Sequence, residues 1–179
     1  MNYNFDHDSS KDCRALPRSA LATCFALILA VNLFGHALAA TGLPLPRYVS
    51  LRASEVNMRT GPGERYPIDW VFHRHGLPVE IVAEFDTWRK IRDAEGAEGW
   101  IHKSLLSGKR TILIIGNIRT LYRKPSITAK AVARAEANVI GKLLDCPEKS
   151  EWCRVDVGAY EGWIKRSNFW GVYPNEIIK

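Results

Sequence analysis

An internal repeat is the feature that most restricts what this chain can fold into. Three kinds of landmark recur along it at nearly constant spacing: an arginine, a tryptophan and a Gly-Trp-Ile triplet. The recurring positions are Arg59 with Arg123 and Trp88 with Trp152, both at a shift of 64, and Gly99 with Gly162, at a shift of 63. A unit of about 60 residues buries little surface alone. The sequence therefore predicts two small, similar units, joined with almost no spacer, that can pack against each other.

The first copy contains a turn that neither a helix nor a strand can pass through. Gly61-Pro62-Gly63 combines a residue with fixed φ and no amide hydrogen with two residues of unusual backbone freedom. We therefore expect an exposed turn between two extended segments. The second copy has Lys124-Pro125-Ser126 in this place, so its turn lacks the glycines.

Short strands are the predicted elements. Val79–Ala83 alternates apolar and polar residues in its first four positions, which predicts a half-buried strand. The segments 89–92 and 99–101 flank the polar stretch Asp93–Gly96, which predicts a hairpin. The continuous apolar run Thr111–Ile115 predicts a buried closing strand.

Two segments are less clear from local composition. Ser104–Leu106 is expected to form a single helical turn. Residues 129–137 are rich in alanine and favour a helix locally, but alignment with the first copy favours a strand, which we expect. Short strands at close spacing predict an all-β fold of small barrels or sandwiches.

The composition is that of a globular protein. Of the 179 residues, 46% are hydrophobic and 25% are charged. The net charge is +6, and residues of both signs are distributed along the chain. No run of five like charges occurs, so a nucleic-acid-binding tail is not indicated. The positive balance fits either weak attraction to acidic polymers or membrane surfaces, or an ordinary solvated surface.

Residues 1–39 have the layout of a secretory signal peptide. Lys11, Arg14 and Arg18 precede an apolar run over 20–34, and Ala37-Leu38-Ala39 then supplies a small-x-small cleavage site. The apolar run is short for a membrane span, which needs about 20 residues. We expect cleavage near Ala40 and no membrane span afterwards; the alternative is an uncleaved anchor.

Two cysteines remain after the predicted cleavage. Cys146 and Cys153 are seven positions apart, in a chain expected to enter a compartment that permits disulfides. We therefore expect a bridge between them. No third cysteine or nearby histidine completes a metal site with this pair, so no metal is predicted there.

These landmarks resemble the bacterial SH3-like (SH3b) domain. The first copy matches at Asn57, Arg59, Gly61, Pro62, Gly63, Gly76, Trp88, Gly99 and Trp100, and the second at Arg123, Trp152, Gly162 and Trp163. The ending at 169–174 looks like that of exported bacterial proteins with two such repeats. The resemblance implies two tandem SH3-like barrels, at 48–110 and 111–174, and no cofactor. It also implies a periplasmic or secreted location.

Aromatic side chains are the natural ligand-binding residues of such barrels, because flat rings supply contact area at a low entropic cost. The candidates are Tyr66, Trp70 and Trp88, with Arg59 beside the turn. The competing interpretation is structural: a tryptophan in a small barrel caps the core, and Arg59 braces the turn through carbonyl hydrogen bonds.

The residues for catalysis are not apparent. The remaining cysteines are expected to be oxidised, and no serine lies in a nucleophile-elbow sequence. His73 and His75 would face one side of a strand, but no third metal ligand is evident. The Gly61-Pro62-Gly63 turn lacks the lysine and helix of a phosphate loop.

The sequence therefore predicts a non-enzymatic binding module of the bacterial cell envelope. We expect it to recognise a wall peptide, peptidoglycan or a protein partner in a shallow groove near the Gly-Pro-Gly turn. The alternatives are a cell-wall hydrolase or its activator, and a membrane-anchored envelope scaffold.

Overall fold

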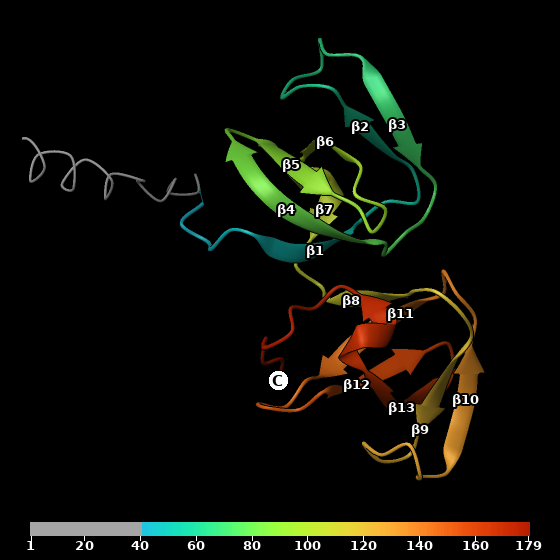
Figure 1. The fold of residues 1–179 in the computed structure, drawn as a ribbon. Coiled ribbons are helices and arrows are strands. Elements are labelled where there is room, and N and C mark those ends of the chain that lie inside the picture. Colours follow the sequence, from blue (N-terminus) through green and yellow to red (C-terminus); the bar gives the residue numbers. More distant parts are fainter. Residues whose placement is uncertain (1–40) are drawn as a thin grey trace, which may run out of the picture. The chain divides into compact units, whose positions relative to one another are not determined.

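The computed structural model describes residues 41–179, and the chain there folds into short antiparallel strands joined by turns (Figure 1). The predicted signal peptide at 1–39 lies outside the described residues. Within residues 41–179, the prediction of an all-β fold is confirmed. Within 41–179, no helical segment has the length and apolar character needed to cross a lipid bilayer.

The first repeat forms a sheet of seven strands in the order β3-β2-β6-β5-β4-β1-β7. The strands are β1 Arg47–Leu51, β2 Val56–Arg59, β3 Ile68–Phe72, β4 Pro78–Phe85, β5 Trp88–Arg92, β6 Glu98–His102 and β7 Leu106–Ser107. The predicted hairpin is β5–β6. The predicted helical turn is the 3-10 segment η2, Lys103–Leu105.

The second repeat forms another seven-stranded sheet, in the order β10-β9-β13-β12-β11-β8-β14. Its strands are β8 Thr111–Ile114, β9 Arg119–Tyr122, β10 Ala131–Ala135, β11 Ile140–Asp145, β12 Trp152–Val157, β13 Tyr160–Lys165 and β14 Phe169–Trp170, with the 3-10 turn η3 Arg166–Asn168 before β14. Strand for strand, the order repeats that of the first sheet. The alanine-rich segment is thus a strand, as the alignment predicted.

The alignment of Arg59 with Arg123 is wrong by one residue. The backbone bond from Thr60 N to Pro67 O (3.1 Å) corresponds to the bond from Arg123 N to Lys130 O (2.9 Å), a shift of 63. Arg59 pairs with Trp100 in β6, and Tyr122 pairs with Trp163 in β13. Tyr122 therefore occupies the place of Arg59. The shift of 64 begins only after the longer connection between β11 and β12.

Each repeat has its own hydrophobic core, and β8 belongs to both. Ile112 and Ile114 lie in the second core, whereas Leu113 between them lies in the first. Alternate side chains of a strand point to opposite faces, so β8 is buried on both faces, which explains its unbroken apolar sequence. It is buried as predicted, and it pairs with β11 and β14 in the second sheet.

The prediction that β4 is half-buried is wrong. Pro78–Ile81 is buried throughout, because the outward side chain of Glu80 meets the second repeat. Glu80 is only 5% exposed, and its carboxylate accepts hydrogen bonds from the Tyr173 hydroxyl at 2.8 Å and from Arg92 at 3.3 Å. A buried carboxylate needs such partners, because burial without them is costly.

Aromatic rings fill the remaining contact between the repeats. The Tyr48 ring lies 5.1 Å from Trp170 in an edge arrangement and 4.7 Å from Tyr173. Burial and the nearby Glu80 carboxylate raise the pKa of both tyrosines. The Tyr173 hydroxyl therefore stays protonated and remains a hydrogen-bond donor.

An ion pair beside these rings holds the C-terminal segment. Arg110 donates to the Glu176 carboxylate (3.0 Å for the Nη2 bond) and to Gly171 O at 2.7 Å. Burial alone would raise the pKa of Glu176. The hydrogen bonds from Arg110 and from the Tyr173 amide, together with the charges of Arg110 and Arg166, outweigh it and hold that pKa below its usual value.

A disulfide joins Cys146 and Cys153 at the start and end of the loop between β11 and β12. Both cysteines are fully buried in the second core. The bridge links the end of β11 to the start of β12, as the sequence predicts.

We expect replacement of both cysteines by alanine to lower the free energy of unfolding by about 2.5 kcal/mol, the entropy of closing an eight-residue loop in the unfolded chain. Urea denaturation of the two proteins measures the difference. A reducing agent should lower the stability of the wild type and leave the double variant unchanged. Equal stability of the variant and the oxidised wild type would contradict the prediction.

We also expect Glu176→Gln to destabilise the protein at pH 7 and to reduce its sensitivity to acid. Because the folded pKa of Glu176 is depressed, its stabilising effect is complete above the unfolded pKa of about 4.3 and is lost as the pH falls through the folded value. The wild-type advantage in urea unfolding should shrink between pH 5 and lower pH. A difference that does not depend on pH would exclude this carboxylate as the source.

Candidate binding surface

The Gly-Pro-Gly turn is built around the ring of Tyr66. An added Cβ at Gly61 would lie 2.4 Å from Cδ1 of that ring, so only glycine fits beneath it. The turn is closed by backbone bonds from Gly63 N to Gly61 O at 3.0 Å and from Tyr66 N to Gly63 O at 3.2 Å. Tyr66 is therefore half-buried in its own turn, with the Arg65 guanidinium 5.3 Å from its ring centre.

Arg59 braces this turn from β2. Its Nη1 atom donates to Tyr66 O at 2.7 Å. Of the two predicted roles for Arg59, this contact supports the structural one. The guanidinium has further donors, so the bond does not exhaust its hydrogen-bonding capacity.

The exposed apolar surface begins immediately after the turn, on β3. Trp70 is 59% exposed and Ile68 is 46% exposed, and both lie on this strand. β3 stands at the end of the first sheet, so one of its edges has no strand partner within residues 41–179 (Figure 1). An unpaired edge bearing large apolar side chains is a template for another extended chain.

The second repeat lacks this apolar surface. Ile68 and Trp70 pair with Arg59 and Met58, and the corresponding partners of Tyr122 and Leu121 are Ala131 and Ala133. The edge strands β3 and β10 have the same place in their sheets, so the difference lies in the side chains. The fold therefore does not require a tryptophan at this position.

Trp88 lies apart from the other candidates. It starts β5, which is three strands away from β3 in the sheet order, and its ring meets His102 edge-on at 5.5 Å. The structure thus brings together Arg59, Tyr66 and the start of β3, and it separates Trp88 from them. Ile68 was not among the predicted residues, and the irregular pairing of β3 with β2 at this point gives no alternation signal that could have indicated it.

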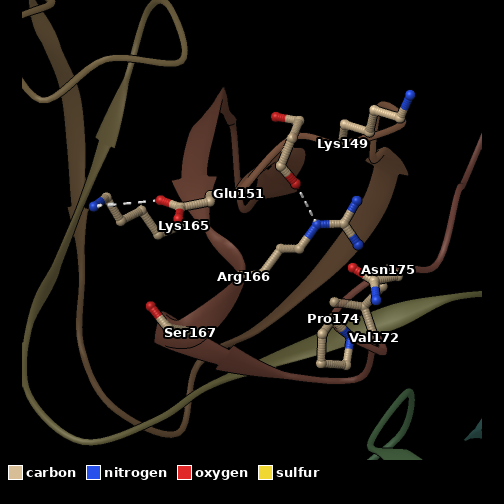
Figure 2. Close-up of a pocket in the computed structure, with 9 residues that line it drawn as sticks. Lys149, Glu151, Lys165, Arg166, Ser167, Val172, Pro174 and Asn175 are labelled. Carbon is tan, nitrogen blue, oxygen red and sulfur yellow. Dashed lines mark hydrogen bonds and ion pairs between the residues drawn. The ribbon is translucent and has the colours of Figure 1, made fainter.

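A hollow of about 430 Å³ lies in the second repeat, beside the disulfide loop (Figure 2). Arg166 projects into it and donates to Ser150 O at 2.8 Å and Glu176 O at 2.7 Å. Lys165 and Glu151 form an ion pair at its side, 3.9 Å apart. Because the guanidinium of Arg166 donates its hydrogen bonds to backbone oxygens of both segments, this side chain links the disulfide loop to the C-terminal segment.

Two other hollows occur, one around Trp163 and one between the repeats. None of the three includes Tyr66 or Trp70. Trp70 lies instead on the open edge of β3 described above.

Metal ligands do not cluster in the part of the chain that the structure describes. No group of three histidine, cysteine, aspartate or glutamate side chains is arranged there to hold an ion. The exposed His73 lies 3.8 Å from Glu55, and His75 is exposed as well.

The sequence matches a profile described as bacterial SH3 domain twice, at residues 52–108 and 116–171. The two matches correspond to the two sheets. No curated protein sequence shows significant similarity to the chain.

Several solved structures are similar in part, among them the following three. NlpC2 from Trichomonas vaginalis has 15% identity and a TM-score of 0.33, with 73% of this chain and 50% of that chain covered. NlpC1 from the same organism has 16% identity, a TM-score of 0.33 and coverages of 75% and 49%. An NlpC/P60 family protein from Bacillus cereus ATCC 10987 has 16% identity, a TM-score of 0.31 and coverages of 68% and 55%. The chain spans about half the length of these proteins. Resemblances of this size carry no information about the activity of this chain.

We expect Gly61→Ala to destabilise the turn by about 1–3 kcal/mol, because the new methyl group and the Tyr66 ring cannot occupy the same space. Gly108→Ala is the matched control, since an added Cβ there meets nothing within 4 Å. Thermal and urea unfolding of both variants measure the effect. Equal stability of the two would show that Tyr66 does not depend on the glycine.

Proposed function

The chain belongs to the bacterial SH3 domain family, and we propose that it is a non-enzymatic binding module of the bacterial cell envelope that recognises a wall peptide or a protein partner. Domains of this family are typically binding modules rather than catalysts. We propose domain limits of 48–110 and 111–174 for the two barrels.

The exposed edge of β3 is the observation that carries this proposal. Trp70 and Ile68 are exposed in the first repeat, and alanines stand in their places in the second. Large apolar side chains kept in water at one edge, and absent from its internal counterpart, are more consistent with a contact surface than with a requirement of the fold.

The geometry supports binding of an extended peptide. A peptide laid along β3 would use its backbone groups to continue the sheet, and its side chains would contact the indole of Trp70. Tyr66, held by Gly61 and Arg59, would fix the end of this surface. A rigid turn lowers the entropic cost of binding.

The proposed location is the periplasm or the exterior of the cell. It is supported by the Cys146–Cys153 bridge, because disulfides persist in oxidising compartments, and by the signal-like residues 1–39. The alternative anchored scaffold would retain that segment. The mass of the native protein tests this, since a mature chain that begins near Ala40 would exclude an anchor.

We expect Trp70→Ala to weaken the binding of purified cell-wall sacculi or of an envelope protein partner by about tenfold, the loss of a single aromatic contact of about 1.4 kcal/mol. Tyr160→Ala is the matched control, because Tyr160 is 55% exposed but lies in the second repeat. Co-sedimentation with sacculi and pull-down from envelope extract measure the change. Equal binding by the two variants would remove β3 from the site.

The same incubation tests the hydrolase alternative. Muropeptides released by the protein alone would contradict a non-enzymatic function, and release only after addition of a wall hydrolase would identify an activator.

A further inference from the structure

A cleft between the two repeats has the largest volume of the three hollows, about 820 Å³. This volume falls within the range of ligand sites, roughly 300–1,000 Å³. Its walls come from the end of β1 and the turn at Gly76 in the first repeat, and from β8, β11 and the β12–β13 turn in the second. The described residues 41–179 belong to one compact unit, so both walls lie within it.

Hydrogen bonds across the junction hold the two walls in place. Arg74 donates to Asn138 O, and the Tyr173 hydroxyl donates to Glu80 at 2.8 Å. The cleft is therefore formed before any ligand enters it, which lowers the cost of binding.

The lining of the cleft is positively charged. It contains Arg52, Lys109, Arg110 and Lys142, and one carboxylate, Asp156. Arg110 and Lys142 are paired with carboxylates, the latter with Asp156 at 3.1 Å.

Two of these cations remain available for a ligand. Within residues 41–179, neither Arg52 nor Lys109 takes part in an ion pair, and both are exposed. Two uncompensated positive charges on a concave surface favour an anionic ligand.

The rest of the lining favours a peptide over a polysaccharide. Ile140 and Leu144, which are half-buried, supply apolar surface, and the buried Thr111 Oγ1 atom has no hydrogen-bond partner. No tryptophan, tyrosine or phenylalanine lines the cleft, so it offers no ring on which a sugar would stack. Asp156 would repel a continuous polyanion but can accept a hydrogen bond from a peptide amide.

We propose that the inter-repeat cleft binds an acidic peptide segment. Its carboxylates would lie at Arg52 and Lys109, and its apolar side chains would lie against Ile140 and Leu144. This site is separate from the surface at Trp70 and does not rest on the function proposed for that surface.

The test is a titration of the ¹⁵N-labelled protein followed by NMR. The probe is the peptide acetyl-Leu-Glu-Glu-Ala-amide, and acetyl-Leu-Gln-Gln-Ala-amide is its neutral counterpart. The amides of Gly76, Gly141 and Gly158 report on the cleft, because all three glycines line it. We expect the acidic peptide to shift these amides and the neutral peptide to leave them unchanged.

Two variants of equal charge locate the effect. Arg52→Ala/Lys109→Ala should weaken binding of the acidic peptide at least tenfold, whereas Arg134→Ala/Lys103→Ala, which removes two exposed cations outside the cleft, should not. Trp70→Ala should also leave the dissociation constant unchanged, even if it abolishes binding to sacculi.

Several results would overturn the proposal. These are no shift of the glycine amides at millimolar peptide, equal shifts with the neutral peptide, or an equal loss in the two double variants. Tighter binding of trigalacturonate than of the peptide, at the same amides, would assign the cleft to an acidic glycan instead.

Discussion

The burial of β8 on both faces is the constraint on which the arrangement of this protein depends. Ile112 and Ile114 complete the second core, and Leu113 completes the first. A barrel of about 60 residues has little core of its own, so a strand that contributes to two cores stabilises both repeats. The repeats are consequently two sheets with a common wall, rather than two independent domains on a linker.

Polar groups at the junction determine how the repeats meet. Burial of Glu80 is tolerated because the Tyr173 hydroxyl and Arg92 satisfy its carboxylate. Arg110 joins the C-terminal segment to the same region through Glu176. Buried polar groups of this kind have few alternative partners, so they fix one relative orientation where apolar contacts alone would permit several. That fixed orientation is also what forms the cleft.

The two copies have diverged in the side chains that the fold leaves free. The first has a glycine turn, a braced Tyr66 and an apolar edge at Trp70, whereas the second has alanines on β10 and a disulfide across β11 and β12. The sheet order is the same in both. Stability and recognition are thus divided between the copies: the second is reinforced covalently, and the first presents the surface proposed to bind.

The sequence by itself determined the all-β fold, the duplication, the hairpin at Asp93–Gly96 and the cysteine pair, because each depends on local pattern or on spacing along the chain. It failed where side chains from distant positions meet. The burial of Glu80, the two-sided burial of β8 and the equivalence of Arg59 with Tyr122 were decided by tertiary structure. Alternation along β4 identifies two faces but not what covers the outer one, and only the packing of one repeat on the other supplies the partner that makes a polar position buried.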